Sequence, residues 1–452
     1  MWLGVKIRAW FLACAVLVFA LLMSGCSVGI DVEALLRPPR PTGEQQKIQE
    51  ALEEYIFSDQ NKQSPEVLGG YILKYPKSGN HRSAFVMQDL NGDGVDEAIV
   101  FYSISKDKGN VRLNLLRKNG GKWETVSDIE GASADIDRVE FGDLNGDGLY
   151  EIVTGWNIDN VSNRLLVLFA FKNGGLEEWH RELYSEYAIH SLTNSGWDDL
   201  LILLSNKAEN VTTAKLLHSK GANTGLSEAG QVNLDGYIQQ FSSPVVSTLA
   251  EGIKGVFVDG ARASGGMVTE LIYWDGERLW APFYDRQKNR NDLTFREGNL
   301  PSMDINGDGV IEWPVVKSVI GYKSSETDKI WFTKWYNWDI KAKKVKEAFS
   351  CIMNMSDGYY FEIDDDWDGL FTLSYDRPSR TLSLYSMDGG KAADRFLMLK
   401  TVFKSEGLGS ESDVEAYDFR LLEDLTEVQF FTWFTDRKPF NLNLERISYR
   451  FT

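Results

Sequence analysis

An acidic stretch of nine residues occurs three times in this chain and constrains its fold more than any other feature. The first copy, residues 89–97, reads Asp-Leu-Asn-Gly-Asp-Gly-Val-Asp-Glu, and residues 143–151 and 304–312 repeat it closely. Each copy has an oxygen-bearing side chain at positions 1, 3, 5 and 9. The glycine at position 6 permits a sharp turn with positive φ. The repetition indicates a fold built from repeated small units.

The side chains in these loops are the oxygen ligands that calcium prefers. With the main-chain carbonyl of position 7, each loop supplies about five protein oxygens, and water completes the six to eight that calcium takes. We therefore expect calcium as a structural cofactor at three sites or more. The predicted ligands are Asp89, Asn91, Asp93, Val95 and Glu97 in the first loop, Asp143, Asn145, Asp147, Leu149 and Glu151 in the second, and Asp304, Asn306, Asp308, Val310 and Glu312 in the third.

Two further segments are weaker copies of the loop. Residues 364–372 keep carboxylates at positions 1, 3 and 5, and these predicted ligands are Asp364, Asp366 and Asp368. Position 9 of this fourth loop is Thr372, yet three carboxylates still favour calcium there. Residues 191–199 keep polar side chains but lack carboxylates at positions 1, 3 and 5, so we predict that this degenerate loop is free of metal. The region 257–270 has lost the loop altogether.

The flanks of the loops distinguish them from an EF-hand. An EF-hand needs a bidentate glutamate at position 12 and a helix on each side, but position 12 here is Val100, Thr154 or Val315. Apolar segments such as residues 98–102 favour strands instead. A repeated acidic loop between two strands resembles the FG-GAP (integrin-type, VCBS-like) repeat, and Phe141-Gly142 before the second loop matches the start of its pattern. The resemblance, over roughly residues 80–375, implies a β-propeller with one loop per blade and ligand or partner binding on one propeller face.

A second unit recurs between the loops, consisting of a strand, a glycine-containing turn and a strand. Residues 111–126 and 271–280 are clear examples, and six such units occur at spacings of about 50–60 residues. We predict an all-β fold, a β-propeller of about seven four-stranded blades, with six as the alternative. Residues 415–421, 428–433 and 444–450 form the last predicted blade, which residues 70–74 join to close the ring. Residues 67–452 are then a single domain.

The first 25 residues are typical of an export signal. Lys6 and Arg8 precede an apolar run of 12 residues, which is shorter than the 20 or so needed to span a membrane. Residues 22–26, Leu-Met-Ser-Gly-Cys, resemble a bacterial lipobox, which implies lipidation at Cys26. The alternative is an ordinary secretory signal with an incidental cysteine. The resemblance implies anchoring to the outer face of the bacterial cytoplasmic membrane, or to the outer membrane in a Gram-negative cell.

A tether and a helix follow the proposed anchor. Residues 26–42 contain a proline-rich run that favours an extended spacer. Thr42 and Gln45 fit a capping box, and Ile48, Leu52 and Ile56 fall on one helical face. We predict a helix over residues 43–57 that docks on the propeller, and a partner-binding helix is the alternative.

Charge and cysteine usage limit the partners. The net charge is −18, which disfavours nucleic acid and bare anionic lipid. We expect a monomer that contacts the membrane through the lipid on Cys26 and binds an unknown protein or glycan ligand. Cys351, between apolar residues, is expected to be a buried strand residue rather than a nucleophile.

Motifs of catalysis are missing from the sequence. The four histidines are not spaced as metal ligands, and neither a nucleophile elbow nor a dinucleotide fingerprint is present. We therefore predict no catalytic residues and a protein that is not an enzyme. The alternatives are a polysaccharide-acting enzyme, with carboxylates converging in a central pocket, and an accessory subunit of an envelope complex. The aromatic residues of 331–338 fit either blade core or sugar stacking.

Overall fold

The fold is an all-β, propeller-type array of six antiparallel sheets, seen in a computed structural model. The structure describes residues 43–58, 70–104, 109–158, 163–222, 224–323, 328–364, 367–406, 419–435 and 447–448. The predicted signal segment, Cys26 and the tether lie outside the described residues. We number the sheets 1 to 6 in chain order.

In sheets 1 to 3 consecutive strands pair, except that β1 pairs with β3 rather than with β2. Sheet 1 contains β1 (Ile72–Leu73), β2 (Phe85–Gln88), β3 (Glu97–Ser103), β4 (Arg112–Asn119) and β5 (Lys122–Glu130). Sheet 2 contains β6 (Ile136–Gly142), β7 (Glu151–Trp156), β8 (Arg164–Lys172) and β9 (Gly175–Tyr184). Sheet 3 contains β10 (Glu186–His190), β11 (Asp199–Asn206), β12 (Val211–Ser219) and β13 (Leu226–Leu234).

Sheets 4 to 6 have five strands each. Sheet 4 contains β14 (Ile238–Phe241), β15 (Val245–Ala250), β16 (Ile253–Arg262), β17 (Met267–Trp274) and β18 (Leu279–Trp280). Sheet 5 contains β19 (Trp313–Lys317), β20 (Ile330–Asp339), β21 (Lys344–Asn354), β22 (Tyr359–Ile363) and β28 (Ile447–Ser448). Sheet 6 contains β23 (Phe371–Asp376), β24 (Thr381–Asp388), β25 (Lys391–Phe403), β26 (Arg420–Asp424) and β27 (Val428–Phe434), and a short 3-10 turn, Lys404–Glu406, follows β25.

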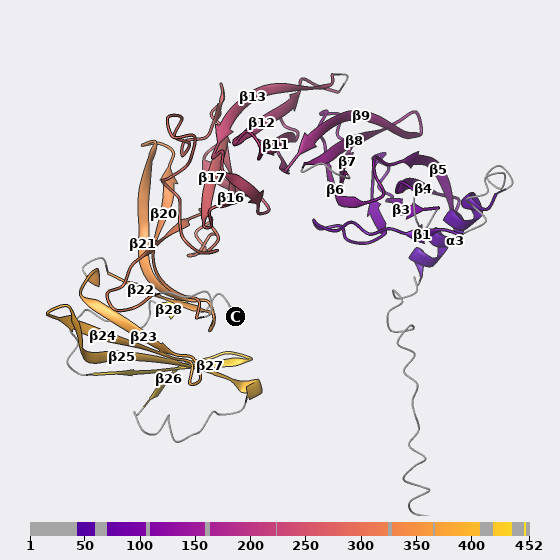
Figure 1. Ribbon diagram of the computed structural model, residues 1–452. Helices are drawn as coiled ribbons and strands as arrows, with labels where there is room; N and C mark the ends of the chain where they lie inside the picture. Colours follow the sequence, from indigo (N-terminus) through magenta and orange to yellow (C-terminus); the bar gives the residue numbers. More distant parts are fainter. Residues whose placement is uncertain are drawn as a thin grey trace, which may run out of the picture.

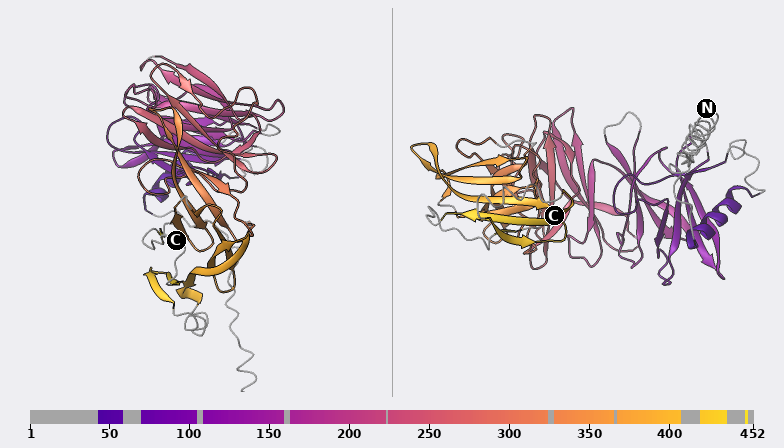
Figure 2. Two further views of the ribbon diagram at one scale, coloured as in Figure 1. Left: turned by 90° about the vertical axis from the view of Figure 1, so that its left-hand side faces the viewer. Right: turned by 90° about the horizontal axis from the view of Figure 1, so that it is seen from below.

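The six sheets follow one another along an arc, as propeller blades do (Figure 1). Sheets 1 and 6 lie at the two ends of this arc, and a second direction of view also separates them (Figure 2). Over the described residues the arc does not close into a ring. The described strands therefore do not form the predicted closed ring.

The hydrophobic core lies in layers between adjacent sheets. Strand β16 illustrates the arrangement, because successive side chains of a strand point to opposite faces of its sheet. Val256 and Val258 pack in the layer between sheets 3 and 4, whereas Phe257 packs in the layer between sheets 4 and 5. Both faces are buried, which explains the unbroken apolar runs of the central strands. Each fully buried aliphatic or phenyl side chain contributes roughly 1.5–3 kcal/mol.

Helix α3 (Glu44–Ile56) covers the outer part of sheet 1. Ile48, Leu52 and Ile56 are buried in one cluster with Phe85 and Trp123 of the sheet, so the docking face is the predicted one. The N-cap is Gly43, which makes no side-chain cap, and Thr42 of the predicted capping box lies outside the described residues. Among the described residues, no helix has the length and apolar character needed to span a membrane.

The described strands form six sheets, the number given by the alternative prediction, rather than the preferred seven. The segments assigned to a separate last blade join existing sheets: β26 and β27 extend sheet 6 beside β25, and β28 pairs with β22. Strand β1 pairs with β3 instead of closing the ring. Strand signals were correctly placed there, but pairing partners are a non-local property that strand patterns do not specify.

Candidate metal centres

The acidic loops lie at equivalent places in successive sheets. The first loop joins β2 to β3, the second joins β6 to β7, and the degenerate loop joins β10 to β11. The third loop precedes β19, and a bridge between Met303 and Glu312 pairs its two flanks. Each of these loops therefore turns the chain from one strand to its neighbour, as predicted from the flanking apolar residues.

In all three acidic loops, backbone N–H groups donate hydrogen bonds to side-chain oxygens of the same loop in the same pattern. The Asp89 carboxylate accepts hydrogen bonds from the backbone N–H groups of Gly92 and Gly94, at 2.8 and 2.9 Å. The equivalent bonds to Asp143 measure 2.7 and 3.0 Å, and those to Asp304 measure 2.6 and 3.0 Å. Positions 3 and 5 each accept the N–H two residues further on. The same pattern of hydrogen bonds to the side chains of positions 1, 3 and 5 therefore recurs in all three loops.

The position-9 glutamates are the buried members of each loop. Glu97, Glu151 and Glu312 are at most 2 % exposed at the base of the loop, and each accepts the backbone N–H of position 2, at 2.9, 2.8 and 3.3 Å. Burial, followed by repulsion from the loop aspartates, raises the pKa of Glu151 and Glu312 to about 7, and the pKa of Glu97 rises for the same first reason. A carboxylate in this environment is stabilised by a cation.

The third loop differs from the other two in one contact. In the first two loops the asparagine amide donates to the position-9 glutamate. In the third, Asn306 donates instead to Asp308 at 3.0 Å, and Glu312 Oε1 is buried without a hydrogen-bond donor in the described part of the chain. An all-oxygen donor set with an unpaired buried oxygen fits calcium. Within the described ranges, however, no three or more acidic, histidine or cysteine side chains are already arranged to hold a metal.

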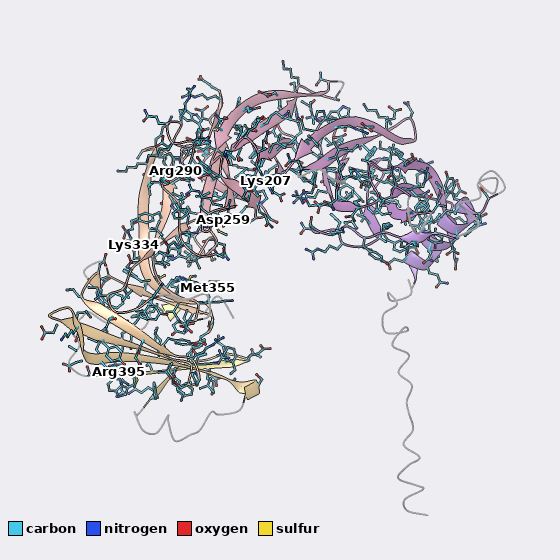
Figure 3. All side chains as sticks on the ribbon, in the orientation of Figure 1. Lys207, Asp259, Arg290, Lys334, Met355 and Arg395 are labelled. Atoms are coloured by element: carbon cyan, nitrogen blue, oxygen red, sulfur yellow. The ribbon has the colours of Figure 1, made fainter. Side chains whose placement is uncertain are left out.

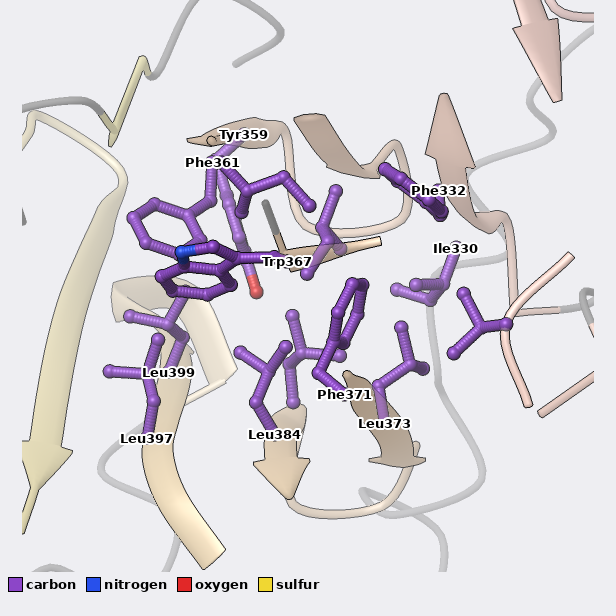
Figure 4. Close-up of a cluster of buried hydrophobic side chains, with 14 of the residues drawn as sticks. Ile330, Phe332, Tyr359, Phe361, Trp367, Phe371, Leu373, Leu384, Leu397 and Leu399 are labelled. Carbon is purple, nitrogen blue, oxygen red and sulfur yellow. The ribbon is translucent and has the colours of Figure 1, made fainter. Parts of the chain in front are cut away.

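The fourth acidic loop has a different structural setting. Its flanks, β22 and β23, belong to sheets 5 and 6, so it does not turn between paired strands. Trp367 within it is buried against Phe361 and Phe371 in the core between those sheets (Figure 4). Asp366 lies outside the described residues. The predicted ligation by Asp364, Asp366 and Asp368 stays a prediction.

The degenerate loop is organised by contacts between its own residues and a neighbouring strand of the same sheet. Asp199 at position 9 is fully buried and accepts the N–H groups of Leu192 and Thr193, both at 2.7 Å. His218 of β12 places Nδ1 at 2.7 Å from the same carboxylate and stacks on Trp197. The spacing of the histidines predicted no metal ligands, and this contact of His218 was not predicted. The available sequence signal for this contact was the aspartate at position 9. A carboxylate there needs a hydrogen-bond or charged partner when the loop has lost its other carboxylates.

Sheet 4 lacks the acidic loop, as predicted, and contains a buried ionic network. Its β15–β16 turn consists of Glu251 and Gly252. Arg296 donates to Asp259 at 2.8 Å, and both side chains are buried. Asp259 lies near the middle of the arc (Figure 3). Sequence analysis did not identify this network, because its members lie far apart along the chain.

Two other sequence predictions concern possible chemistry. Cys351 is fully buried on β21, as expected, and burial raises the pKa of its thiol to about 12, so it is not a nucleophile. Trp331 and Trp335 are also buried, which confirms core packing over sugar stacking for these two rings.

Comparisons with known proteins agree with the repeat. The FG-GAP-like repeat model matches residues 85–154, a stretch that contains the first two acidic loops. The resemblance inferred from the loops is therefore confirmed for this stretch. No curated protein matches the chain.

Several solved structures share parts of the fold. A rhamnogalacturonan lyase matches at 12% identity and a TM-score of 0.30, covering 71% of this chain and 69% of its own. The periplasmic gluconolactonase of Pseudomonas aeruginosa matches at 12% identity and 0.27, covering 71% and 86%. The exo-β-1,3-galactanase of Phanerochaete chrysosporium matches at 8% identity and 0.28, covering 74% and 81%. We predicted that this chain is not an enzyme. That prediction is wrong, because these structural neighbours are enzymes. Their low scores assign no reaction to it.

Proposed function

We propose that this FG-GAP-type propeller is an exported, calcium-braced lipoprotein that binds a ligand or protein partner outside the cytoplasmic membrane as a monomer. The carrying observation is the set of buried position-9 glutamates, Glu97, Glu151 and Glu312, each adjacent to loop aspartates. A bound cation offsets the repulsion among these carboxylates and the cost of their burial.

Calcium has a structural role in this proposal. The oxygens of positions 1, 3, 5 and 9 would hold the ion, with the position-7 carbonyl as the remaining protein ligand. The ion then ties the end of one strand to the start of the next, because position 9 is the first residue of β3 and of β7. Extracellular calcium modules bind at about 10⁻⁴–10⁻³ M, which suits a site that stays occupied outside the cell.

Thermal unfolding of the full mature chain tests the calcium role. We expect the melting temperature to rise with calcium and to fall in chelator, and we expect the difference to shrink in Asp143→Asn. Ser195→Ala, in the degenerate loop, is the matched control and should leave the difference unchanged. Equal melting temperatures in calcium and chelator would refute the proposal.

The anchoring part of the proposal has its own test. Cys26→Ser should abolish incorporation of labelled fatty acid and move the protein from the membrane fraction to the soluble fraction. Cys351→Ser leaves the lipobox intact and is the control. Unchanged fatty-acid labelling of Cys26→Ser would show that Cys26 is not the anchor.

A further inference from the structure

A polar cavity is lined by residues of β2 in sheet 1, β6 in sheet 2 and β10 in sheet 3, together with residues of neighbouring loops. Its volume is about 510 Å³, which is within the range of roughly 300–1,000 Å³ typical of small-ligand sites. Its polar lining includes His81, Gln88, Glu140, Tyr150 and Asp198. Three of these residues lie in the loops or next to them. Gln88 immediately precedes the first loop, Tyr150 is position 8 of the second loop, and Asp198 is position 8 of the degenerate loop.

The lining combines hydrogen-bond donors and acceptors. The carboxylates of Glu140 and Asp198 are acceptors, whereas the amide of Gln88 and the hydroxyl of Tyr150 can donate. Neither His81 nor Tyr150 makes a side-chain hydrogen bond within the described part of the chain. Both side chains can therefore form hydrogen bonds with a ligand. Hydroxyl groups are donors and acceptors at once, and a lining of this mixed kind matches them.

Aromatic surface accompanies these polar groups. Phe141 also lines the cavity, and the His81 ring lies edge-on to it with 5.2 Å between ring centroids. Tyr150 is 44% exposed beside them. Rings of this kind provide amphipathic contact area, which suits the apolar C–H face of a sugar ring.

Charge argues against an anionic ligand. Neither lysine nor arginine is among the residues that line the cavity. The guanidinium of Arg138, which lies 3.6 Å from Glu140, is bound by Glu186. This contact also balances part of the acidic charge, so the cavity does not require a cationic ligand.

We propose that this cavity binds a neutral, hydroxyl-rich saccharide. The inference rests on the proposed ligand-binding function and specifies its ligand class. It also couples the ligand to calcium, because the N–H of Asp198 donates to the carbonyl of Asp143, a predicted calcium ligand, at 2.8 Å. We expect saccharide binding to weaken when calcium is removed.

Ligand-observed NMR and calorimetry with the purified full chain test the proposal. The probes are neutral tetrasaccharides of glucose, mannose and galactose, with tetragalacturonate and tetraglucosamine as the anionic and cationic comparisons. We expect a neutral tetrasaccharide to bind, and Tyr150→Ala to weaken it on the order of tenfold. Tyr237→Ala removes a tyrosine of similar exposure, 40%, from the turn between β13 and β14, and should have no effect.

The outcomes separate this inference from the proposed function. If none of the neutral probes binds while calcium still raises the melting temperature, the saccharide inference fails and the calcium role stands. Preferred binding of the charged probes, or equal weakening by Tyr150→Ala and Tyr237→Ala, also overturns it. Glu140→Gln, which keeps the shape of the side chain, should weaken binding without lowering the melting temperature. An unchanged melting temperature would show that the weaker binding is not caused by misfolding.

Discussion

The backbone N–H of Asp198 donates a hydrogen bond of 2.8 Å to the carbonyl oxygen of Asp143. This bond joins the degenerate loop of sheet 3 to the second acidic loop of sheet 2. A similar contact links the second loop to the first, where a Cβ added at Gly92 would lie 2.9 Å from Leu149. The position-7 side chain of one loop thus covers the position-4 glycine of the preceding loop, and neighbouring sheets are in contact through their loops.

Gly146→Ala should lower the free energy of unfolding by about 2–5 kcal/mol, measured by urea unfolding in calcium. Gly146 has φ +77°, which costs an alanine roughly 1–2 kcal/mol, and the added Cβ would lie 2.7 Å from the Trp197 ring, which overpacks the contact by about 1–3 kcal/mol. Gly148→Ala is the control, since Gly148 has φ +84° but open space around it. Equal losses in the two variants would show that Trp197 moves aside freely.

Stability should fall as pH rises because of Glu270. Burial raises its pKa to about 8, whereas an unfolded glutamate has a pKa of about 4.3. The folded state therefore holds the extra proton, so this contribution to stability is complete below about pH 4.3 and is lost as pH rises to about 8. One group gives a slope of at most about 1.4 kcal/mol per pH unit.

Urea unfolding of Glu270→Gln between pH 5 and 8.5, at saturating calcium, measures this contribution. The variant should be less pH-dependent than the unaltered chain and more stable than it at pH 8.5. Glu277→Gln, at an exposed position of the same sheet, should keep the original pH dependence. Parallel pH profiles for the unaltered chain and Glu270→Gln would contradict the assignment.

Asp199→Ala should destabilise the chain by about 2–6 kcal/mol, and to the same extent in calcium and in chelator. The substitution leaves the buried N–H groups of Leu192 and Thr193 without an acceptor, and each unsatisfied donor costs roughly 1–3 kcal/mol. Asp143→Ala, by contrast, should cost more in calcium than in chelator, because it also removes an ion ligand. Thermal unfolding in both buffers distinguishes the two. A calcium-dependent loss in Asp199→Ala would mean that the degenerate loop binds an ion.

Local features of the sequence predicted local features of the structure. The glycine-centred loops and the hairpins over residues 111–126 and 271–280 were predictable because turn chemistry and strand alternation are encoded within a few residues. The pairing of β28 with β22 was not, since its partner lies more than 80 residues away in sequence. The contact of His218 with Asp199 was missed for the same reason, because it crosses from one strand to the next.

The buried pair of Arg296 and Asp259 is the clearest case of a feature hidden from sequence analysis. Both side chains are almost inaccessible to solvent, and Asp259 also accepts the hydroxyl of Thr269 at 2.6 Å and the N–H of Ser302 at 2.8 Å. The pair holds residues that follow β18 against sheet 4. The ion pair therefore stabilises sheet 4 with protein charges alone, whereas a calcium ion is proposed to stabilise the neighbouring sheets.

Removing one partner should be far more costly than removing an exposed pair. Arg296→Met leaves the Asp259 carboxylate buried without its cation, and such losses are about 3–5 kcal/mol. Asp259→Leu should cost as much, while the double variant should cost less than the sum of the two, with a coupling of roughly 1–3 kcal/mol. Arg181→Met, which breaks an exposed pair with Glu178, should cost about 1 kcal/mol at most. Urea unfolding of the four variants provides the comparison, and strictly additive losses would show that the two buried charges act independently.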